Sequence, residues 1–179
     1  MRALIQRVRH ASVTVCGPSR EGLGSIGPGL LVFLGIATGD GAEEARYLAE
    51  KVVNLRIFDD EAGRFNRSAI DTGAELLVVS QFTLYADTRK GRRPSFTDAA
   101  PPSEAEPLYR QAVALFHESG LRVATGRFAE EMEGAVVDEA ERARSARGAG
   151  GAAVGGGHRH EVSVAAQILA EPGRRVGEG

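Results

Sequence analysis

A continuous apolar run, Leu76-Leu77-Val78-Val79, ends in a cluster of hydroxyl and amide side chains, and this junction constrains the fold more than any other part of the chain. Four consecutive aliphatic residues predict a strand that is buried on both faces. We expect this strand to span residues 75–84. A strand holds its backbone firmly, so polar groups at its end are positioned well enough for site chemistry. The polar end carries Ser80, Gln81, Phe82 and Thr83.

Thr83 is the candidate nucleophile of this cluster, with Ser80 and Gln81 as further catalytic candidates. A hydroxyl nucleophile normally needs a base beside it, and none of the four histidines has an evident partner in the sequence. Three alternatives stay open. Thr83 orients a scissile carbonyl, backbone N–H groups form an oxyanion hole, or the segment is an ordinary strand edge.

A basic loop follows the polar cluster. Arginine is favoured for bidentate contacts with phosphate, and Phe96 beside the cations can stack on a base. The net charge is only -2, so attraction to phosphate has to come from a local patch of this kind. We expect the loop to bind the phosphates of an anionic substrate, the alternative being a solvated loop. Its cations are Arg89, Lys90, Arg92 and Arg93.

The rest of the chain mixes short strands with two amphipathic helices, which predicts an α+β (mixed α/β) domain. We expect a curled sheet or partial barrel, with one face covered by a second subunit. Helices are expected from an Asp40 cap to about residue 54, and from Ser103 to Gly120. Other strands are expected at residues 4–8, 11–15, 30–36, 55–58 and 121–125.

Composition narrows the functional classes. The single cysteine, Cys16, excludes an internal disulfide and fits a reducing compartment. There is no apolar run of about 18 residues, so no membrane span is expected, and charges near the start argue against a signal peptide. We expect a cytoplasmic protein. No cofactor and no metal are expected, because His158 and His160 have no further ligands at suitable spacing.

Residues 133–179 differ in composition from the rest. Gly, Ala, Arg and Glu fill most of this segment, and every Phe and Tyr precedes Met132. We therefore divide the chain into a domain, residues 1–137, and a tail, residues 138–179. The abrupt change suggests a shifted reading frame in a GC-rich gene. Sequencing the gene tests this hypothesis, which an intact frame with no nearby frame encoding Gly-Pro-Val-Thr would reject.

Eight short segments occur in a specific order along the chain: Gln6-Arg7-Val8, Ala11-Ser12-Val13-Thr14-Val15, Gly29-Leu30-Leu31-Val32, Arg56-Ile57-Phe58, Ser80-Gln81-Phe82-Thr83-Leu84, Arg93-Pro94-Ser95-Phe96, Thr125-Gly126-Arg127-Phe128 and Met132. Together they closely resemble the D-aminoacyl-tRNA deacylase family, once called D-tyrosyl-tRNA deacylase. The resemblance covers residues 1 to about 133. The Ser-Gln-Phe-Thr-Leu motif is one of the two signatures of that family.

The resemblance implies a homodimer, with active sites at the subunit interface, that acts on aminoacyl-tRNA. The implied reaction is hydrolysis of the ester joining a D-amino acid, or glycine, to the terminal ribose. It gives the catalytic role either to Thr83 or to the ribose 2′-hydroxyl, and the missing base beside Thr83 favours the second. The implied pocket residues are Ser80, Gln81, Phe82 and Thr83, with Arg7, Phe128 and Met132 as further substrate contacts.

One feature of the family is missing. The family ends in a Gly-Pro dipeptide that enters the partner's pocket and excludes L-amino acids, and no Gly-Pro follows Met132 here. We therefore expect relaxed chiral rejection and, without the family's final strands, an open sheet edge. Two alternative functions stay open: a tRNA-binding protein with lost or relaxed catalysis, and a general small-ester hydrolase using Thr83.

Overall fold

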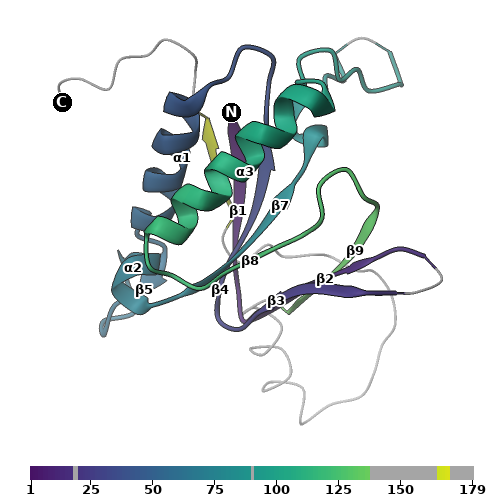
Figure 1. The fold of residues 1–179 in the computed structure, drawn as a ribbon. Helices are drawn as coiled ribbons and strands as arrows, with labels where there is room; N and C mark the ends of the chain where they lie inside the picture. Colours follow the sequence, from purple (N-terminus) through teal and green to yellow (C-terminus); the bar gives the residue numbers. More distant parts are fainter. Residues whose placement is uncertain (18–19, 90, 138–164, 170–179) are drawn as a thin grey trace, which may run out of the picture.

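The structure is a computed structural model, and it describes residues 1–17, 20–89, 91–137 and 165–169. Its larger sheet has five strands in the order β10-β1-β4-β7-β8 (Figure 1). Strand β1 is antiparallel to both of its neighbours, whereas β4, β7 and β8 are parallel. The strands are β1 (Arg2–Val8), β4 (Gly29–Gly35), β7 (Glu75–Ser80), β8 (Val123–Thr125) and β10 (Ala165–Leu169).

A smaller sheet, ordered β3-β2-β9, crosses beneath the larger one (Figure 1). Its strands are β2 (His10–Val15), β3 (Gly22–Ile26) and β9 (Met132–Val137). Only Arg9 separates β1 from β2, so the chain bends directly from one sheet into the other. The mixed α+β class is confirmed, and the described strands close no barrel.

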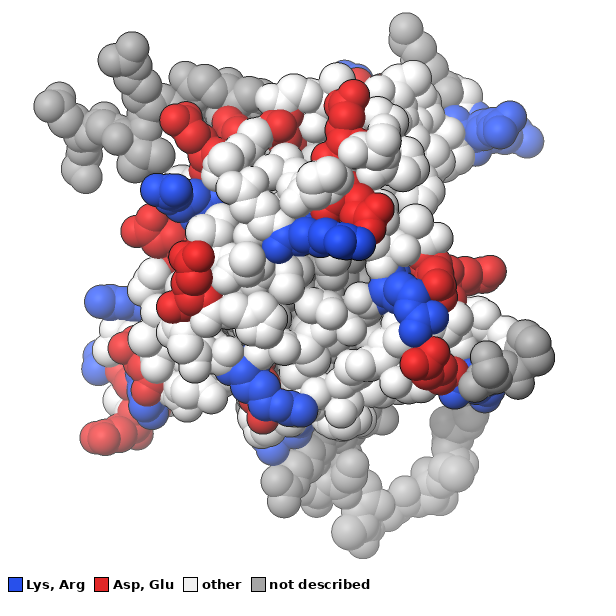
Figure 2. Space-filling model, viewed as in Figure 1, with Lys and Arg blue, Asp and Glu red and all other residues white. Residues whose placement is uncertain are grey.

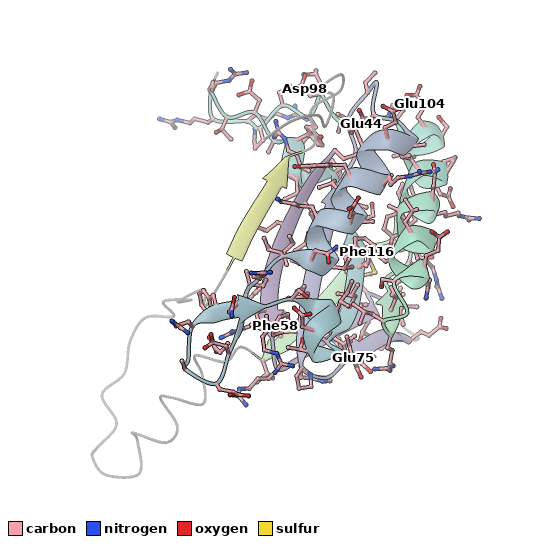
Figure 3. All side chains as sticks on the ribbon, turned by 90° about the vertical axis from the view of Figure 1, so that its left-hand side faces the viewer. Glu44, Phe58, Glu75, Asp98, Glu104 and Phe116 are labelled. Atoms are coloured by element: carbon pink, nitrogen blue, oxygen red, sulfur yellow. The ribbon has the colours of Figure 1, made fainter. Side chains whose placement is uncertain are left out.

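Helices cover one face of the larger sheet (Figure 1). The two long ones are α1 (Ala42–Asn54) and α3 (Pro102–Glu118), and a short helix, α2 (Ala69–Thr72), was not expected. Phe116 of α3 is fully buried in this layer (Figure 3). No helix among the described residues is long and apolar enough to cross a membrane.

Both long helices begin differently from the sequence prediction. Gly41 is the N-cap of α1, and its N–H donates to the Glu44 carboxylate over 2.8 Å. Asp40 instead accepts the Ala37 N–H at 2.6 Å and pairs with the Met1 ammonium at 2.6 Å, so it is not available as a cap. Helix α3 begins at Pro102, because proline is well suited to the first position of a helix, where its missing N–H would have no acceptor within the helix.

The end of α3 and most expected strands are confirmed. Gly120 follows α3 with a φ of 79°, the left-handed conformation that glycine adopts without strain. The strand expected at residues 55–58 is wrong: pairing is confined to β5 (Phe58–Asp59), which forms a hairpin with β6 (Phe65–Arg67). Residues 55–57 instead connect α1 to this hairpin, because no neighbouring strand pairs with them.

The edge of β1 is covered by a strand from the tail, which the sequence did not predict. Strand β10, which comes from the tail, pairs with β1 in antiparallel register from Arg2↔Leu169 to Gln6↔Ala165. The main-chain groups on that side of β1 are therefore paired, as in the interior of a sheet. Residues 138–164 and 170–179, with His158 and His160, lie outside the described residues.

Successive side chains of β4 and β7 point to opposite faces of the larger sheet, so an apolar layer forms on each face. On β4 and β7, Leu30, Val32, Leu76 and Val78 face the helices, and the residues between them, among them Leu31, Leu77 and Val79, face the smaller sheet. Within β4 only Phe33 is partly exposed. The second layer is thus incomplete near the carboxyl end of β4, and a pocket lies there.

Candidate active site

A pocket of about 890 Å³ opens at the carboxyl ends of β4 and β7. It lies between these strand ends, the segment before α3, and the segment of residues 127–132 that leads into β9. Apolar surface predominates in its walls, as is usual for small-molecule sites. The main apolar side chains around it are Phe33, Val79, Phe82, Phe96, Phe128 and Met132.

The polar cluster is where the sequence placed it, but the strand is shorter than expected. Strand β7 ends at Ser80, and residues Phe82–Tyr85 form a single turn of 3-10 helix, η1. The last ladder contact joins the Gln81 N–H to the Leu34 carbonyl at 2.9 Å. Beyond it β4 ends and β8 reaches no further than Val78, so no strand is available to pair with the chain.

The turn brings the predicted site residues together. Ser80, Gln81 and Phe82 line the pocket, and the Gln81 side-chain amide donates a hydrogen bond to the Thr83 hydroxyl. The Phe82 side chain is 57% exposed, and its ring meets that of Phe96 edge-on at a centroid distance of 5.1 Å. A hydrogen-bonded pair of polar side chains, Gln81 and Thr83, therefore lies beside an aromatic pair in which Phe82 is exposed and Phe96 is half-buried.

Thr83 has no base among its described neighbours. Its hydroxyl receives the Gln81 amide, which is not a base, and no other described group is hydrogen-bonded to it. His10 and His117 are exposed, on β2 and α3, and neither lines the pocket. The geometry thus suits Thr83 for orienting a bound group better than for attack by its own oxygen.

Phe128 and Met132 also line the pocket, as expected for its wall. The Phe128 ring packs on Tyr109 with centroids 5.7 Å apart. The Met132 sulfur accepts the Arg127 N–H at 3.3 Å and lies where a Cβ on Gly126 would come within 2.8 Å of it. The segment leading into β9 is therefore held close to the pocket by its own side chains.

Arg7 lies on the other face of the sheet and does not line the pocket of its own chain. It shares a strand face with Ala3 and Ile5, which pack under the helices. Its guanidinium donates to the Ile57 carbonyl at 2.9 Å and to the Asp59 carboxylate at 3.1 Å. The side chain is thus buried against the β5–β6 hairpin.

The basic loop leaves from the rim of the pocket. Main-chain hydrogen bonds of 2.8 and 2.9 Å between Asp87 and Ser95 close its base, one residue from Phe96. Arg89 is paired with Asp87, and its hydrogen bonds lower the pKa of that carboxyl to about 2. Arg92 and Arg93 are exposed and make no ion pair with any described residue, whereas Lys90 lies outside the described residues.

Charge is well mixed on the helical face of the molecule. Figure 2 shows basic and acidic side chains interspersed over the helical face. The described residues hold no cluster of three His, Cys, Asp or Glu that could bind a metal ion. Arg92 and Arg93, exposed and without an ion pair to a described residue, therefore lie on the loop that leaves the pocket rim.

Several pocket residues were not predicted from the sequence. Phe33 was hidden inside an apolar run, and its partial exposure follows only from the incomplete second layer. Arg127 lines the rim and pairs with Glu21 at 2.9 Å and with Glu130 at 3.3 Å. Arg127 belongs to the segment of residues 125–128 that resembles the family, so the sequence could have indicated it as a pocket residue. That segment does not show that acidic side chains lie beside Arg127.

The chain is similar to proteins of one family. It matches the family described as D-Tyr-tRNA(Tyr) deacylase over residues 4–139. A D-aminoacyl-tRNA deacylase of Roseiflexus sp. (strain RS-1) is 59% identical over 139 residues, which are 78% of this chain and 88% of the relative. A D-aminoacyl-tRNA deacylase of Heliobacterium modesticaldum is 54% identical over 151 residues, 84% of this chain and 99% of the relative.

Solved structures show the same architecture. One, described as c-Myc DNA Unwinding Element Binding Protein, matches with a TM-score of 0.76 and 30% identity, over 96% of this chain and 99% of its own. Another, described as a probable eukaryotic D-amino acid tRNA deacylase, matches with a TM-score of 0.69 over 77% of this chain and 94% of its own. Its identity is 15%, so it supports the fold alone.

Proposed function

Because the chain belongs to the D-Tyr-tRNA(Tyr) deacylase family, we propose that it hydrolyses the ester bond of D-aminoacyl-tRNA and releases the free D-amino acid and the tRNA. Esters of glycine are substrates of the same kind, because glycine presents no L side chain to exclude. The observation that carries the proposal is the pocket at the end of β7, with Ser80, Gln81 and Phe82 in its wall. Such a reaction proofreads chirality after aminoacylation.

The turn at the mouth of the pocket suits this chemistry. The first N–H groups of a helix have no acceptor within it, and here they belong to Phe82 and Thr83 at the start of η1. A substrate carbonyl seated beside the turn would receive these donors as its oxygen gains charge. An aminoacyl ester is already reactive, so positioning and oxyanion stabilisation supply much of what hydrolysis needs.

Different parts of the pocket wall suit different parts of the substrate. The apolar surface around Phe128 and Met132 suits the aminoacyl group, and the exposed Phe82 ring suits stacking with the terminal base. Thr83, held by Gln81, would orient the terminal ribose or the ester. In this arrangement water attacks the ester carbonyl, and the ribose 2′-hydroxyl orients that water and relays its proton to the ribose oxygen that leaves, so no side-chain base is needed.

Deacylation of matched D- and L-aminoacyl-tRNA by the purified chain tests the proposed function. We expect turnover of the D-ester, and of the L-ester within about tenfold of it, because selectivity needs a repulsive element against the wrong substrate. No Gly-Pro follows Met132 to supply one. An intact member of the family is the control, and protection of the L-ester equal to that of the control would contradict the expectation.

Arg92 and Arg93 are proposed as the main tRNA contacts, because neither is paired with a described residue. Replacing both with Gln is expected to weaken tRNA binding and to reduce the slope of log K against log salt by about two. Arg89→Gln is the matched comparison, and a smaller effect is expected because Asp87 already holds that guanidinium. Equal salt slopes for the double variant and the parent would contradict this assignment.

We further propose that the chain acts as a homodimer in the cytoplasm, where aminoacyl-tRNA is made and used. Strand β9 is at the edge of its sheet, and Val136 and Val137 on it are 37% and 43% exposed. Val136 also lines the pocket, so a second copy on this edge would complete the site. A solution mass equal to that of a single 18.9 kDa chain would contradict the dimer.

Two other functions make different predictions. A tRNA-binding protein without catalysis is favoured by the basic loop, and it predicts tight binding with no turnover of the D-ester. A general small-ester hydrolase would cleave esters that lack tRNA. The matched deacylation assay and a simple aminoacyl ester therefore separate all three.

A further inference from the structure

Arg2, near the start of β1, reaches across the sheet end to the turn that carries the site residues. Its guanidinium donates to the Leu84 carbonyl at 2.9 Å and lies over the Tyr85 ring at 4.3 Å from the centroid. Arg2 is paired with Gly35 in the ladder, so the sheet itself holds the arginine at this point. We propose that Arg2 is a positioning residue for the reaction, which holds the turn of residues 82–85 in its catalytic geometry. This inference rests on the proposed function.

The Leu84 carbonyl needs a donor from outside the turn. In a 3-10 helix the donor for a carbonyl is the N–H three residues later, which here is that of Asp87. That N–H instead donates to the Ser95 carbonyl at 2.8 Å, at the base of the basic loop. Arg2 supplies the missing partner, and a cation is the favoured partner for carbonyls at the end of a helix.

The same arginine fixes the side chain at the end of the turn. Tyr85 is buried, with 7% of its surface exposed, and burial raises the pKa of its phenol to about 12. The ring therefore stays neutral and presents its face to the guanidinium, which is the favourable geometry for a cation and an aromatic ring. Two contacts from one side chain thus hold two consecutive residues of the turn.

The opposite side of the turn rests on glycine. A Cβ at Gly35 would come within 3.1 Å of the Gln81 carbonyl oxygen and 3.1 Å of the Leu84 Cβ. The turn is therefore seated directly on the end of β4 and held there by Arg2. Since Gln81 and Thr83 project from this turn, a small displacement of it moves the groups that contact the substrate.

Arg2→Met tests the inference, because it keeps the aliphatic stem and removes the donor and the charge. We expect kcat on D-aminoacyl-tRNA to fall about tenfold with KM changed less than about threefold, and we expect Arg2→Lys to recover part of the loss. Amide hydrogen exchange should rise at residues 82–86 and stay unchanged at residues 76–79. Arg46→Met, on the exposed surface of α1, is the matched control and should behave like the parent.

The outcomes separate this inference from the proposed function. If the parent deacylates and Arg2→Met matches it in kcat and in exchange, the inference fails and the function stands. If the parent shows no turnover, the proposed function fails and with it the role of Arg2 in the reaction. A loss of kcat in Arg46→Met equal to that in Arg2→Met also overturns the inference. Should Arg2→Met fail to fold, Arg2→Gln, which keeps N–H donors without the charge, enters the same measurements.

Discussion

A substrate whose terminal ribose lacks the 2′-hydroxyl is expected to be deacylated at least about 100-fold more slowly than the ribose form. Thr83→Ala, in contrast, is expected to lose less than about tenfold on the ribose substrate. The reason is the setting of Thr83, whose hydroxyl receives the Gln81 amide and is hydrogen-bonded to no described base. The ribose 2′-hydroxyl would then orient the attacking water and relay its proton, and the protein would position the ester.

Single-turnover rates of the parent and Thr83→Ala on 2′-deoxy and ribose substrates measure both effects. Thr88→Ala is the matched control, because Thr88, like Thr83, is an exposed threonine outside the pocket lining, but it does not receive the Gln81 amide. If Thr83 is instead the nucleophile, the pattern reverses. Thr83→Ala would lose nearly all activity and the 2′-deoxy substrate would react normally, and cleavage of esters that lack tRNA would then decide between a Thr83-dependent deacylase and a small-ester hydrolase.

Much of the framework could be predicted from local pattern. The apolar runs of β4 and β7 are buried on both faces, as continuous apolar stretches of strand length indicate. Ser80, Gln81 and Phe82 of the polar cluster line a pocket at this strand end, whereas Thr83 does not. These features depend on a few consecutive residues, and that is why the sequence alone could reveal them.

The features that could not be predicted depend on distant parts of the chain. Strand β7 ends at Ser80 because β4 and β8 provide no further partner, and no local signal at residues 81–84 announces this. Arg7 is two residues from Ile5 on β1, so both side chains are on the face of the sheet that packs against the helices. The pocket is on the opposite face. Asp40 resembles a helix cap in sequence, but the Met1 ammonium and the Ala37 N–H occupy its carboxylate.

Strand β10 could not be predicted either. The Gly- and Ala-rich composition of the tail supported no fold assignment, yet residues Ala165–Leu169 pair along β1. Extended pairing needs main-chain groups and an available edge more than a particular composition. The edge of β1 provides the main-chain groups with which the tail pairs. Only the three-dimensional arrangement shows that the tail reaches this edge.

Gly29→Ala is expected to destabilise the fold by at least about 3 kcal/mol. A Cβ at Gly29 would lie 1.9 Å from the Glu75 carbonyl oxygen and 2.9 Å from its nitrogen, and both atoms are backbone. No side-chain rotation can relieve this clash, so the start of β4 has to separate from β7. The Gly27 N–H, which donates to the Glu75 carboxylate at 2.8 Å, would be displaced with it.

Urea unfolding of the parent, Gly29→Ala and Gly22→Ala measures this cost. Gly22 is the matched control, because it also lies in a strand and a Cβ there would meet no atom within 4 Å; its substitution is expected to change the free energy of unfolding by less than about 0.5 kcal/mol. Because β4 and β7 together carry the pocket at their far ends, the Gly29 variant should also lose deacylation in proportion to its unfolded fraction. Equal unfolding midpoints for Gly29→Ala and the parent would show that β4 and β7 do not approach as closely as the structure has them, and the position of η1 on the end of β4 would then lose its support.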